Sequence, residues 1–220
     1  MKKYKKYQDL VIHKGKFIGE FELMYKSFKD PWKYKQIGER NIDYKIIEYL
    51  ASKAFENLKK KKNKISIVDI GCGHGMVSYN LAKDGFNVIG TDISRTIISK
   101  AKRKYKHSRL KFFVSDFDNY KFYKDLNPDI FLLSNISWYV LPKLKNFIKF
   151  FKKKKKNLII HCLAFPDNQK YGKKYFYDEK TLINFFNLNI LCKSNIISKN
   201  NDSKVNRKVE MRTYFLGKNY

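Results

Sequence analysis

Val68-Asp69-Ile70-Gly71-Cys72-Gly73-His74-Gly75 is the stretch of sequence that decides the fold. The β-branched run over residues 65–70 predicts a short strand, and the glycines end it. Apolar residues with helical spacing then predict a helix over residues 76–83. A strand, a glycine-rich turn and a helix in this order are typical of an open α/β sheet, in which ligands bind at the carboxyl ends of the strands.

The alternation of strand and helix continues along the chain. Apolar and β-branched runs predict further strands over residues 87–92, 110–115, 129–134, 158–163, 188–198 and 208–216. Apolar residues with helical spacing predict further helices over residues 46–58, 95–105, 142–151 and 179–186. We therefore expect an α/β fold: a Rossmann-like, doubly wound, seven-stranded sheet that ends in an antiparallel hairpin and carries an amino-terminal helical cover.

Length and composition favour one globular domain. The chain has 220 residues, of which 43% are hydrophobic and 16% aromatic, and this content argues against a disordered chain. We expect a single domain over residues 1–220, with residues 1–60 covering the ligand site and residues 61–220 forming the core. No apolar stretch approaches the roughly 18 residues that a membrane-spanning helix needs, and residues 1–7 lack the apolar core of a signal peptide. A soluble, cytoplasmic protein is therefore expected.

The cysteines indicate neither a disulfide framework nor a metal site. Cys72, Cys162 and Cys192 lie in apolar or glycine-rich surroundings, and no two of them form a CxxC pair. This pattern predicts reduced thiols, so we expect no bound metal.

The formal charge of +28 has two explanations. A lysine-rich surface gains affinity for phosphates, which suggests a nucleic acid, whereas joint abundance of Lys, Asn, Ile, Tyr and Phe is expected of an AT-rich genome. The basic runs at residues 59–64 and 152–156 directly precede predicted strands, so we expect them at the edge of the sheet opposite the ligand site, as solvated helix ends. Lys170, Lys173 and Lys174 follow a strand and would suit an anionic acceptor such as a nucleotide-linked sugar.

The glycine turn departs from the dinucleotide-binding pattern. Its spacing is GxGxG, and Met76 stands where GxGxxG would place the last glycine. Asp69 lies in the approach to the turn, where an acid would repel a pyrophosphate and attract a cationic amino group. The turn therefore predicts a ligand with a positively charged end.

Two further strand ends predict a nucleoside. Asp92 ends the second strand of the core. Its separation from the turn along the sequence is the one at which an acid binds ribose hydroxyls in such sheets. After the third strand, Asp116 and Phe117 supply a polar group and an aromatic ring for an adenine.

The combined motifs resemble the class I S-adenosylmethionine-dependent methyltransferases over about residues 65–165. They are VDIGCGHG at 68–75, GTDIS at 90–94, SDF at 115–117 and PDIFLLSNISW at 128–138. The resemblance implies S-adenosyl-L-methionine as cofactor and a cofactor site made by Asp69, Gly71, Cys72, Gly73, Asp92, Ile93, Asp116, Phe117 and Asn135, with Ser134 beside it. The alternative is that these are ordinary turn glycines and strand-end acids of another Rossmann-like fold.

The amino-terminal sequence resembles a narrower group. Residues 19–25, 30–32 and 39–40 are similar to the entry of sugar and nodulation-factor N-methyltransferases and of related enzymes of polysaccharide biosynthesis. That resemblance implies that Trp32 covers the cofactor and Arg40 meets its carboxylate. For Trp32 the alternative is a packing residue after Pro31. The sequence departs from the group's pattern at Asn41, directly after Arg40.

Residues after the fourth strand argue against several acceptors. Enzymes that methylate exocyclic amines of bases usually present Asn or Asp, then Pro-Pro and an aromatic residue, where this chain has residues 134–138, SNISW. Methylation at carbon 5 of cytosine needs a thiolate, and Cys162 and Cys192 are expected to be buried and inert. Metal-dependent catechol methylation needs a second acid where Asn135 stands.

We therefore predict methyl transfer to a small-molecule acceptor, a sugar or glycan precursor, on nitrogen or oxygen. Glu22, Tyr25, His74 and His161 are candidates for contact with ligands, and His161 is also explained as a hydrogen-bonded core residue. Two other functions stay open: an RNA methyltransferase that uses the basic surface, and a non-catalytic protein that binds the cofactor.

Overall fold

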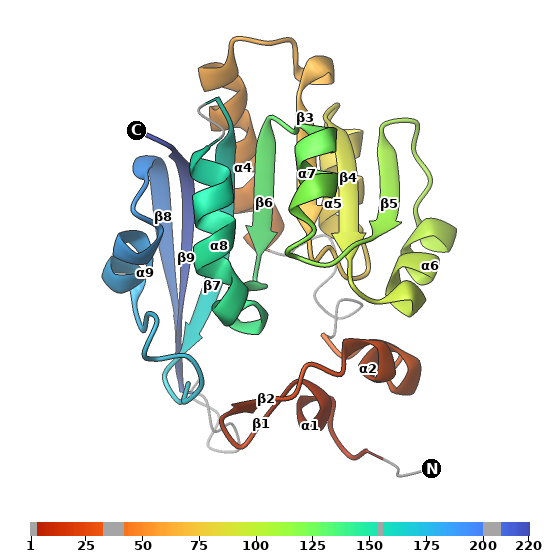
Figure 1. Cartoon of the computed structure of the whole chain (residues 1–220), viewed down its shortest axis with the longest axis vertical. Helices are drawn as coiled ribbons and strands as arrows, with labels where there is room; N and C mark the ends of the chain where they lie inside the picture. Colours follow the sequence, from red (N-terminus) through yellow and green to blue (C-terminus); the bar gives the residue numbers. More distant parts are fainter. Residues whose placement is uncertain (1–3, 33–41, 154–155, 200–207) are drawn as a thin grey trace.

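The computed structural model describes residues 4–32, 42–153, 156–199 and 208–220 (Figure 1). Within these ranges seven strands form one mixed sheet in the order β5-β4-β3-β6-β7-β9-β8. The strands are β3 (Ser66–Ile70), β4 (Asn87–Asp92), β5 (Leu110–Val114), β6 (Ile130–Ser134), β7 (Leu158–Pro166), β8 (Asn189–Lys199) and β9 (Val209–Lys218). Strands β3 to β7 run parallel, and β9 runs antiparallel between β7 and β8. This topology confirms the predicted Rossmann-like fold with its terminal antiparallel pair.

Strand β3 lies at the centre of the parallel part of the sheet. It pairs with β4 on one side and with β6 on the other, so that Asp69 lies opposite Gly90 and Leu132. Its side chains from Ile67 to Ile70 are buried, as expected of a parallel strand covered on both faces. The glycine turn after β3, the end of β4 and the end of β6 therefore meet at one edge of the sheet.

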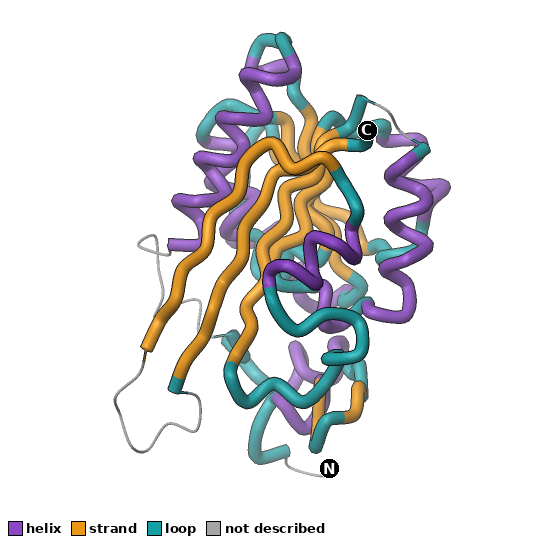
Figure 2. The backbone as a smooth tube through the Cα atoms, turned by 90° about the vertical axis from the view of Figure 1, so that its left-hand side faces the viewer, coloured by secondary structure: helices purple, strands orange, loops and turns teal. Residues whose placement is uncertain are grey.

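Helices cover both faces of the sheet (Figure 2). The helices α4 (Ile42–Leu58), α5 (Met76–Lys83) and α6 (Arg95–Lys104) share one hydrophobic core with one face. The helices α7 (Tyr120–Leu126), α8 (Leu141–Lys152) and α9 (Glu179–Phe186) share a second core with the other face. None of the helices in the described ranges is long and apolar enough to cross a membrane.

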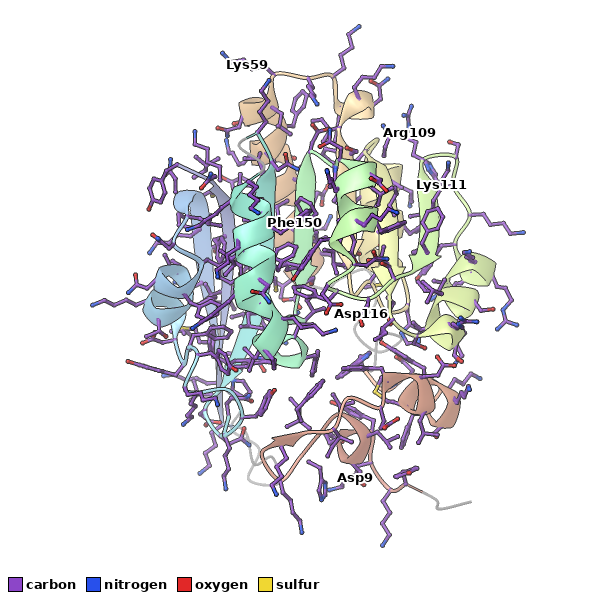
Figure 3. All side chains as sticks on the ribbon, in the orientation of Figure 1. Asp9, Lys59, Arg109, Lys111, Asp116 and Phe150 are labelled. Atoms are coloured by element: carbon purple, nitrogen blue, oxygen red, sulfur yellow. The ribbon has the colours of Figure 1, made fainter. Side chains whose placement is uncertain are left out.

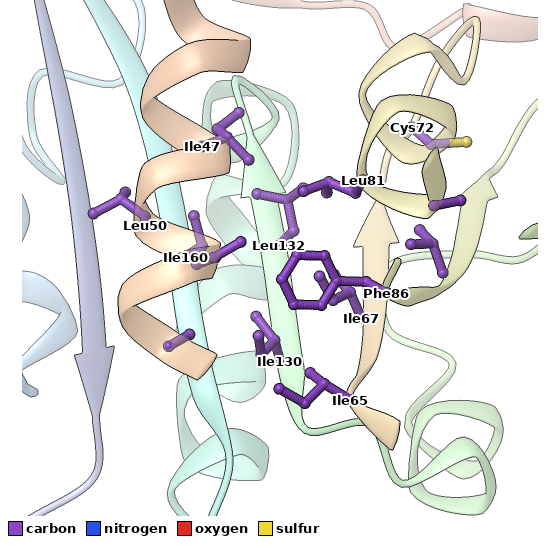
Figure 4. Close-up of a cluster of buried hydrophobic side chains, with 14 of the residues drawn as sticks. Ile47, Leu50, Ile65, Ile67, Cys72, Leu81, Phe86, Ile130, Leu132 and Ile160 are labelled. Carbon is purple, nitrogen blue, oxygen red and sulfur yellow. The ribbon is translucent and has the colours of Figure 1, made fainter. Parts of the chain in front are cut away.

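Helix α4 belongs to the layered core. Ile47 and Leu50 are completely buried, and Figure 4 shows them beside Leu132 of β6 and Ile160 of β7. Burying a side chain of this kind stabilises a protein by about 1.5–3 kcal/mol. The apolar stripe that predicted this helix is thus explained by contact with the sheet, so α4, which falls within the cover expected over residues 1–60, packs in the core.

We call residues 4–32 the amino-terminal segment. It contains α1 (Gln8–Val11), the short hairpin β1 (Ile12–His13) and β2 (Lys16–Phe17), and α2 (Phe21–Ser27). Figure 1 shows it beneath the carboxyl ends of the strands. A third hydrophobic cluster, which includes Met24 and Ile97, joins it to α6.

Candidate active site

A cavity of about 1160 Å³ lies between the carboxyl edge of the sheet and the amino-terminal segment. Residues that follow β3, β4, β5, β6 and β7 line it from the sheet side, and aromatic side chains of the amino-terminal segment line it from the other. Of the residues predicted from the sequence, the cavity is lined by Trp32, Gly71, Gly73, Asp92, Ile93, Asp116, Phe117, Ser134 and Asn135. Arg40 lies outside the described residues.

The glycine turn is shaped by its backbone conformation. Gly71 has a φ angle of +74°, and a Cβ atom there would lie 2.4 Å from Cγ2 of Ile136. Gly73 has a φ angle of +53° and exposes its backbone to the cavity. Larger residues are therefore excluded at Gly71 by both strain and contact.

Asp92 is held by two backbone donors. Its Oδ2 accepts a hydrogen bond from the Gly73 N–H at 3.1 Å, and its Oδ1 accepts one from the Ser94 N–H at 2.9 Å. The side chain is only 8% exposed, and burial raises the pKa of Asp92 to about 6. Each carboxylate oxygen has two lone pairs, so the fixed carboxylate retains capacity to accept hydrogen bonds from ligand hydroxyls.

Asp69 and Cys72 are buried and are not among the cavity-lining residues. Oδ2 of Asp69 accepts a hydrogen bond from the Ser78 hydroxyl of α5 at 2.5 Å. Burial raises the pKa of Asp69 to about 7, with a further contribution from the charge of Asp92, and burial also raises the pKa of the Cys72 thiol. Their contact with a cofactor stays a prediction.

Asp116, which is labelled in Figure 3, stands at the cavity wall. Its Oδ1 accepts a hydrogen bond from Nζ of Lys143 at 2.9 Å. Burial raises the pKa of Asp116, but the hydrogen bond and charge of Lys143 outweigh it, and the pKa lies below its usual range. The neighbouring Phe117 is 5% exposed and packs against Phe147 with ring centres 5.0 Å apart. Phe117 is thus part of the core as well as of the cavity wall.

Trp32 has a packing role in the wall. Its Nε1–H donates to the Tyr25 hydroxyl at 3.0 Å, and its ring lies 4.9 Å from Tyr7 and 5.8 Å from Tyr139. These contacts fit the packing interpretation of Trp32, and its position on the wall also allows it to cover a ligand.

Glu22 is used to attach the amino-terminal segment to α6. Its carboxylate accepts hydrogen bonds from the hydroxyls of Ser94 and Thr96, both at 2.6 Å, and from the Thr96 N–H at 3.2 Å. Burial raises the pKa of Glu22, but these hydrogen bonds outweigh it and lower the pKa to about 2. The carboxylate therefore caps the amino terminus of α6, where negative charge is favourable.

The two histidines singled out from the sequence do not line the cavity. His161 is completely buried, its Nε2 lies 2.7 Å from the Ser137 hydroxyl, and its ring stacks on Phe215. Burial lowers the pKa of His161 to about 3, so the ring is a neutral core residue at physiological pH. His74 lies against the Tyr25 ring, with Nε2 3.4 Å from the Lys29 carbonyl oxygen.

A polar cluster that we did not predict lines the far side of the cavity. Arg212 of β9 pairs with Asp43 of α4, and its Nε donates to Oε1 of Glu210 at 2.7 Å. The Tyr214 hydroxyl also donates to Asp43, and Nδ2 of Asn135 lies 3.4 Å from Oδ2 of the same carboxylate. We call Asp43, Glu210 and Arg212 the acid–arginine cluster. Its sequence signal is the alternation of Glu210, Arg212 and Tyr214 along one strand, which places all three on one face.

Lys59, the first residue of one basic run, lies away from the cavity. Figure 3 shows Lys59 at the end of the molecule opposite the amino-terminal segment and away from Asp116. Lys170, in contrast, lines the cavity, and Lys173 lines a smaller neighbouring cavity of about 430 Å³. In the described part of the chain, no group of three or more His, Cys, Asp and Glu side chains is arranged to hold a metal ion.

Comparison with known proteins bears on the same region. Residues 67–154 match a family described as "Methyltransferase domain". A ubiquinone biosynthesis O-methyltransferase of Rickettsia akari is 32% identical over 78 residues, which cover 34% of this chain and 31% of that protein. One of Hydrogenovibrio crunogenus is 32% identical over 98 residues, which cover 43% and 37%. The matched region spans about a third of the length of these relatives.

Solved structures resemble most of the chain. A SAM-dependent methyltransferase from Anabaena variabilis gives a TM-score of 0.60 at 13% identity and covers 82% of this chain and 86% of its own. TehB from Haemophilus influenzae gives 0.59 at 15% identity and covers 87% and 66%. At these identities the likeness concerns the fold. The chain thus has the fold of these methyltransferases, and its residues 67–154 match a methyltransferase-domain family.

Proposed function

We propose that this protein transfers a methyl group from S-adenosyl-L-methionine to a small-molecule acceptor bound under the amino-terminal segment. One observation carries the proposal: a single cavity joins the glycine turn and Asp92 to the acid–arginine cluster. The glycine turn and Asp92 suit a nucleoside. The acid–arginine cluster is a separate polar surface that remains for an acceptor.

The residues of the cavity fit the cofactor. Gly71 and Gly73 would permit close approach of the methionine part to the backbone, and Asp92 would accept hydrogen bonds from the ribose hydroxyls. Asp116, Phe117 and Ile93, which also line the cavity, would contact the adenine. Trp32 would cover the bound molecule, and Asn135 would border it from β6. Asp69 and Cys72, which do not line the cavity, would influence the cofactor from their buried positions behind the turn. A role for Arg40 in cofactor binding rests on the sequence alone.

The cofactor supplies a methyl group on a positively charged sulfur, and this charge disappears during transfer. The protein's part is to align the acceptor and to exclude water. Aromatic side chains from both sides of the cavity serve this purpose, because Phe21 and Trp32 of the amino-terminal segment both contact Tyr139.

The acceptor that we propose is a sugar or glycan precursor. The resemblance of the amino-terminal sequence to sugar and polysaccharide methyltransferases supports it, and so does Lys170 at the cavity, which would suit a nucleotide-linked sugar. The basic run that begins at Lys59 gives no support to the RNA alternative, because Lys59 lies at the end of the molecule opposite the amino-terminal segment.

Calorimetry with S-adenosyl-L-methionine tests the proposal. We expect binding at micromolar concentrations of cofactor and displacement by S-adenosylhomocysteine. Absence of heat at millimolar cofactor would refute the enzyme function. Tight RNA binding that persists at physiological salt would favour the RNA alternative instead.

A further inference from the structure

We infer that Lys143 is a positioning residue, which holds the carboxylate of Asp116 toward the 6-amino group of the cofactor's adenine and so sets the preference for that base. This inference rests on the proposed function, in which Asp116 contacts the adenine, and it adds a residue that controls this contact. Lys143 and Asp116 both line the cavity.

Lys143 binds two carboxylates of the loop after β5. Its Nζ donates to Oδ1 of Asp116 at 2.9 Å and lies 3.1 Å from Oδ2 of Asp118. One ammonium group is thus shared between two acids that stand two positions apart in the sequence. Because both ion pairs meet at the same nitrogen atom, the position of Lys143 determines the direction in which the Asp116 side chain points.

Helix preference does not explain Lys143. The residue follows Pro142 in the first turn of α8. The amino terminus of a helix carries a partial positive charge, so an acid is favoured there and a cation is not. The ion pairs with Asp116 and Asp118 compensate for this unfavourable position. A residue that departs from the local rule in this way indicates a role in the site beside it.

The backbone of Asp116 is fixed separately from its side chain. The hydroxyl of Tyr123, a completely buried residue of α7, donates to the Asp116 carbonyl oxygen at 3.0 Å. The next residue, Phe117, packs against Phe147 of α8. Helices α7 and α8 lie on the same face of the sheet and share one core (Figure 1). The freedom that remains to Asp116 is rotation of its side chain, and Lys143 restricts that rotation.

The ion pair keeps Asp116 an acceptor of hydrogen bonds. Burial raises the pKa of Asp116, but the hydrogen bond and charge of Lys143 outweigh it and lower the pKa, so the carboxylate is ionised at neutral pH. Each oxygen of an ionised carboxylate has two lone pairs, so Asp116 can accept from a 6-amino group while Oδ1 keeps its bond to Lys143.

This arrangement selects adenine over hypoxanthine. Hypoxanthine has a carbonyl oxygen where adenine has its amino group, and that oxygen would face the Asp116 carboxylate with no proton between the two acceptors. A site built to accept a hydrogen bond from a ligand rejects an analogue that lacks the donor.

Calorimetry with S-adenosylhomocysteine and S-inosylhomocysteine tests the inference. The two probes differ at position 6 of the base and carry the same ribose and homocysteine, so a change elsewhere in the site affects both and leaves the ratio of their affinities unchanged. We expect the wild type to bind S-adenosylhomocysteine about 10- to 100-fold more tightly, as for loss of a hydrogen bond to a charged group.

Variants of Lys143 connect this ratio to the ion pair. Lys143→Met should reduce the ratio about two- to fivefold through weaker binding of S-adenosylhomocysteine alone, because an ion pair that water reaches contributes little and Lys143 is 39% exposed. Lys143→Arg keeps a cation for Asp116 and should restore most of the ratio. Lys193→Met is the matched control, because Lys193 also pairs with an acid, Glu179, but neither residue lines the cavity.

Asp116→Asn tests the contact with the base directly. The asparagine amide can donate to the carbonyl oxygen of hypoxanthine, so the ratio should fall close to one in this variant. Thermal unfolding of each variant shows that it is folded.

Several outcomes would overturn the inference. Equal binding of the two probes by the wild type, or a full ratio in Asp116→Asn, would show that Asp116 does not select the base. An unchanged ratio in Lys143→Met, whether both affinities fall together or neither falls, would show that Lys143 does not position Asp116. A higher ratio in that variant would show that Lys143 contacts the base itself. A wild-type protein that binds neither probe refutes the methyltransferase proposal itself, whereas the other outcomes leave that proposal standing.

Discussion

The backbone N–H of Gly73 donates to the carboxylate of Asp92 at 3.1 Å, so the turn after β3 is joined directly to the end of β4. The Ser94 N–H donates to the other oxygen at 2.9 Å. One carboxylate thus fixes two loops of the cavity and also has capacity for a ligand.

Replacement of Asp92 by alanine should abolish cofactor binding. Loss of two hydrogen bonds to a charged group corresponds to a decrease in affinity of roughly 100-fold or more. Calorimetry with S-adenosylhomocysteine measures it, with Glu179→Gln as a control that retains affinity. Normal affinity in Asp92→Ala would show that the ribose assignment is wrong.

Replacement of His161 by alanine should lower stability and leave cofactor affinity intact. The ring is buried between Ser137 and aromatic neighbours and does not line the cavity. We expect a loss of about 2–4 kcal/mol in the free energy of unfolding, measured by urea denaturation. A folded variant with reduced cofactor affinity would contradict the core assignment.

Asp69 should make stability depend on pH. Burial raises its pKa from 3.8 to about 7, so between these values the folded state keeps a proton that the unfolded state releases. Its contribution to stability is therefore fully present below about pH 4 and is lost as the pH rises through about 7.

The variant Asp69→Asn does not titrate and isolates this effect. Between pH 4 and pH 8 its free energy of unfolding, relative to the wild type, should rise by up to about 4 kcal/mol. Urea denaturation over that pH range measures the difference. A difference that stays constant with pH would contradict the raised pKa.

Glu22 should hold the amino-terminal segment on α6. Removal of a capping carboxylate costs about 1 kcal/mol. In Glu22→Ala we expect faster hydrogen exchange in residues 4–32 and in the first turn of α6, with little change in β3 and β6. Glu20→Ala is the control from the same segment, and equal exchange in both variants would argue against the cap.

Gly71→Ala should distort the cavity. The positive φ and the approach to Ile136 at 2.4 Å predict a loss of stability of about 1–3 kcal/mol, together with weaker cofactor binding. Gly217→Ala in β9 is the control, because the nearest atom to its added Cβ lies at 3.4 Å. Thermal unfolding and calorimetry measure the two effects.

The sequence predicted the parts of the fold that depend on local pattern. The glycine turn, the acid at the end of β4 and the buried strands each follow from neighbouring residues. The short hairpin of β1 and β2 and the helix α7 were missed, because two-residue strands and a seven-residue helix carry little periodicity.

The candidate site was predictable only in part. Asp92 and Asp69 each lie near the end of a parallel strand, yet of these two only Asp92 lines the cavity. Asp69 lies one residue before the end of its strand, and its carboxylate accepts a hydrogen bond from Ser78 of α5 instead. The pairing of Arg212 with Asp43 joins residues 169 positions apart and depends on where β9 enters the sheet. No pattern of neighbouring residues in the sequence predicts such a contact.

Ser94 connects the two halves of the cavity wall. Its amide bonds to Asp92, while its hydroxyl bonds to Glu22 of α2. A displacement of α2 would therefore disturb Ser94, whose amide holds the carboxylate of Asp92, so Ser94 links the amino-terminal side of the cavity to the end of β4.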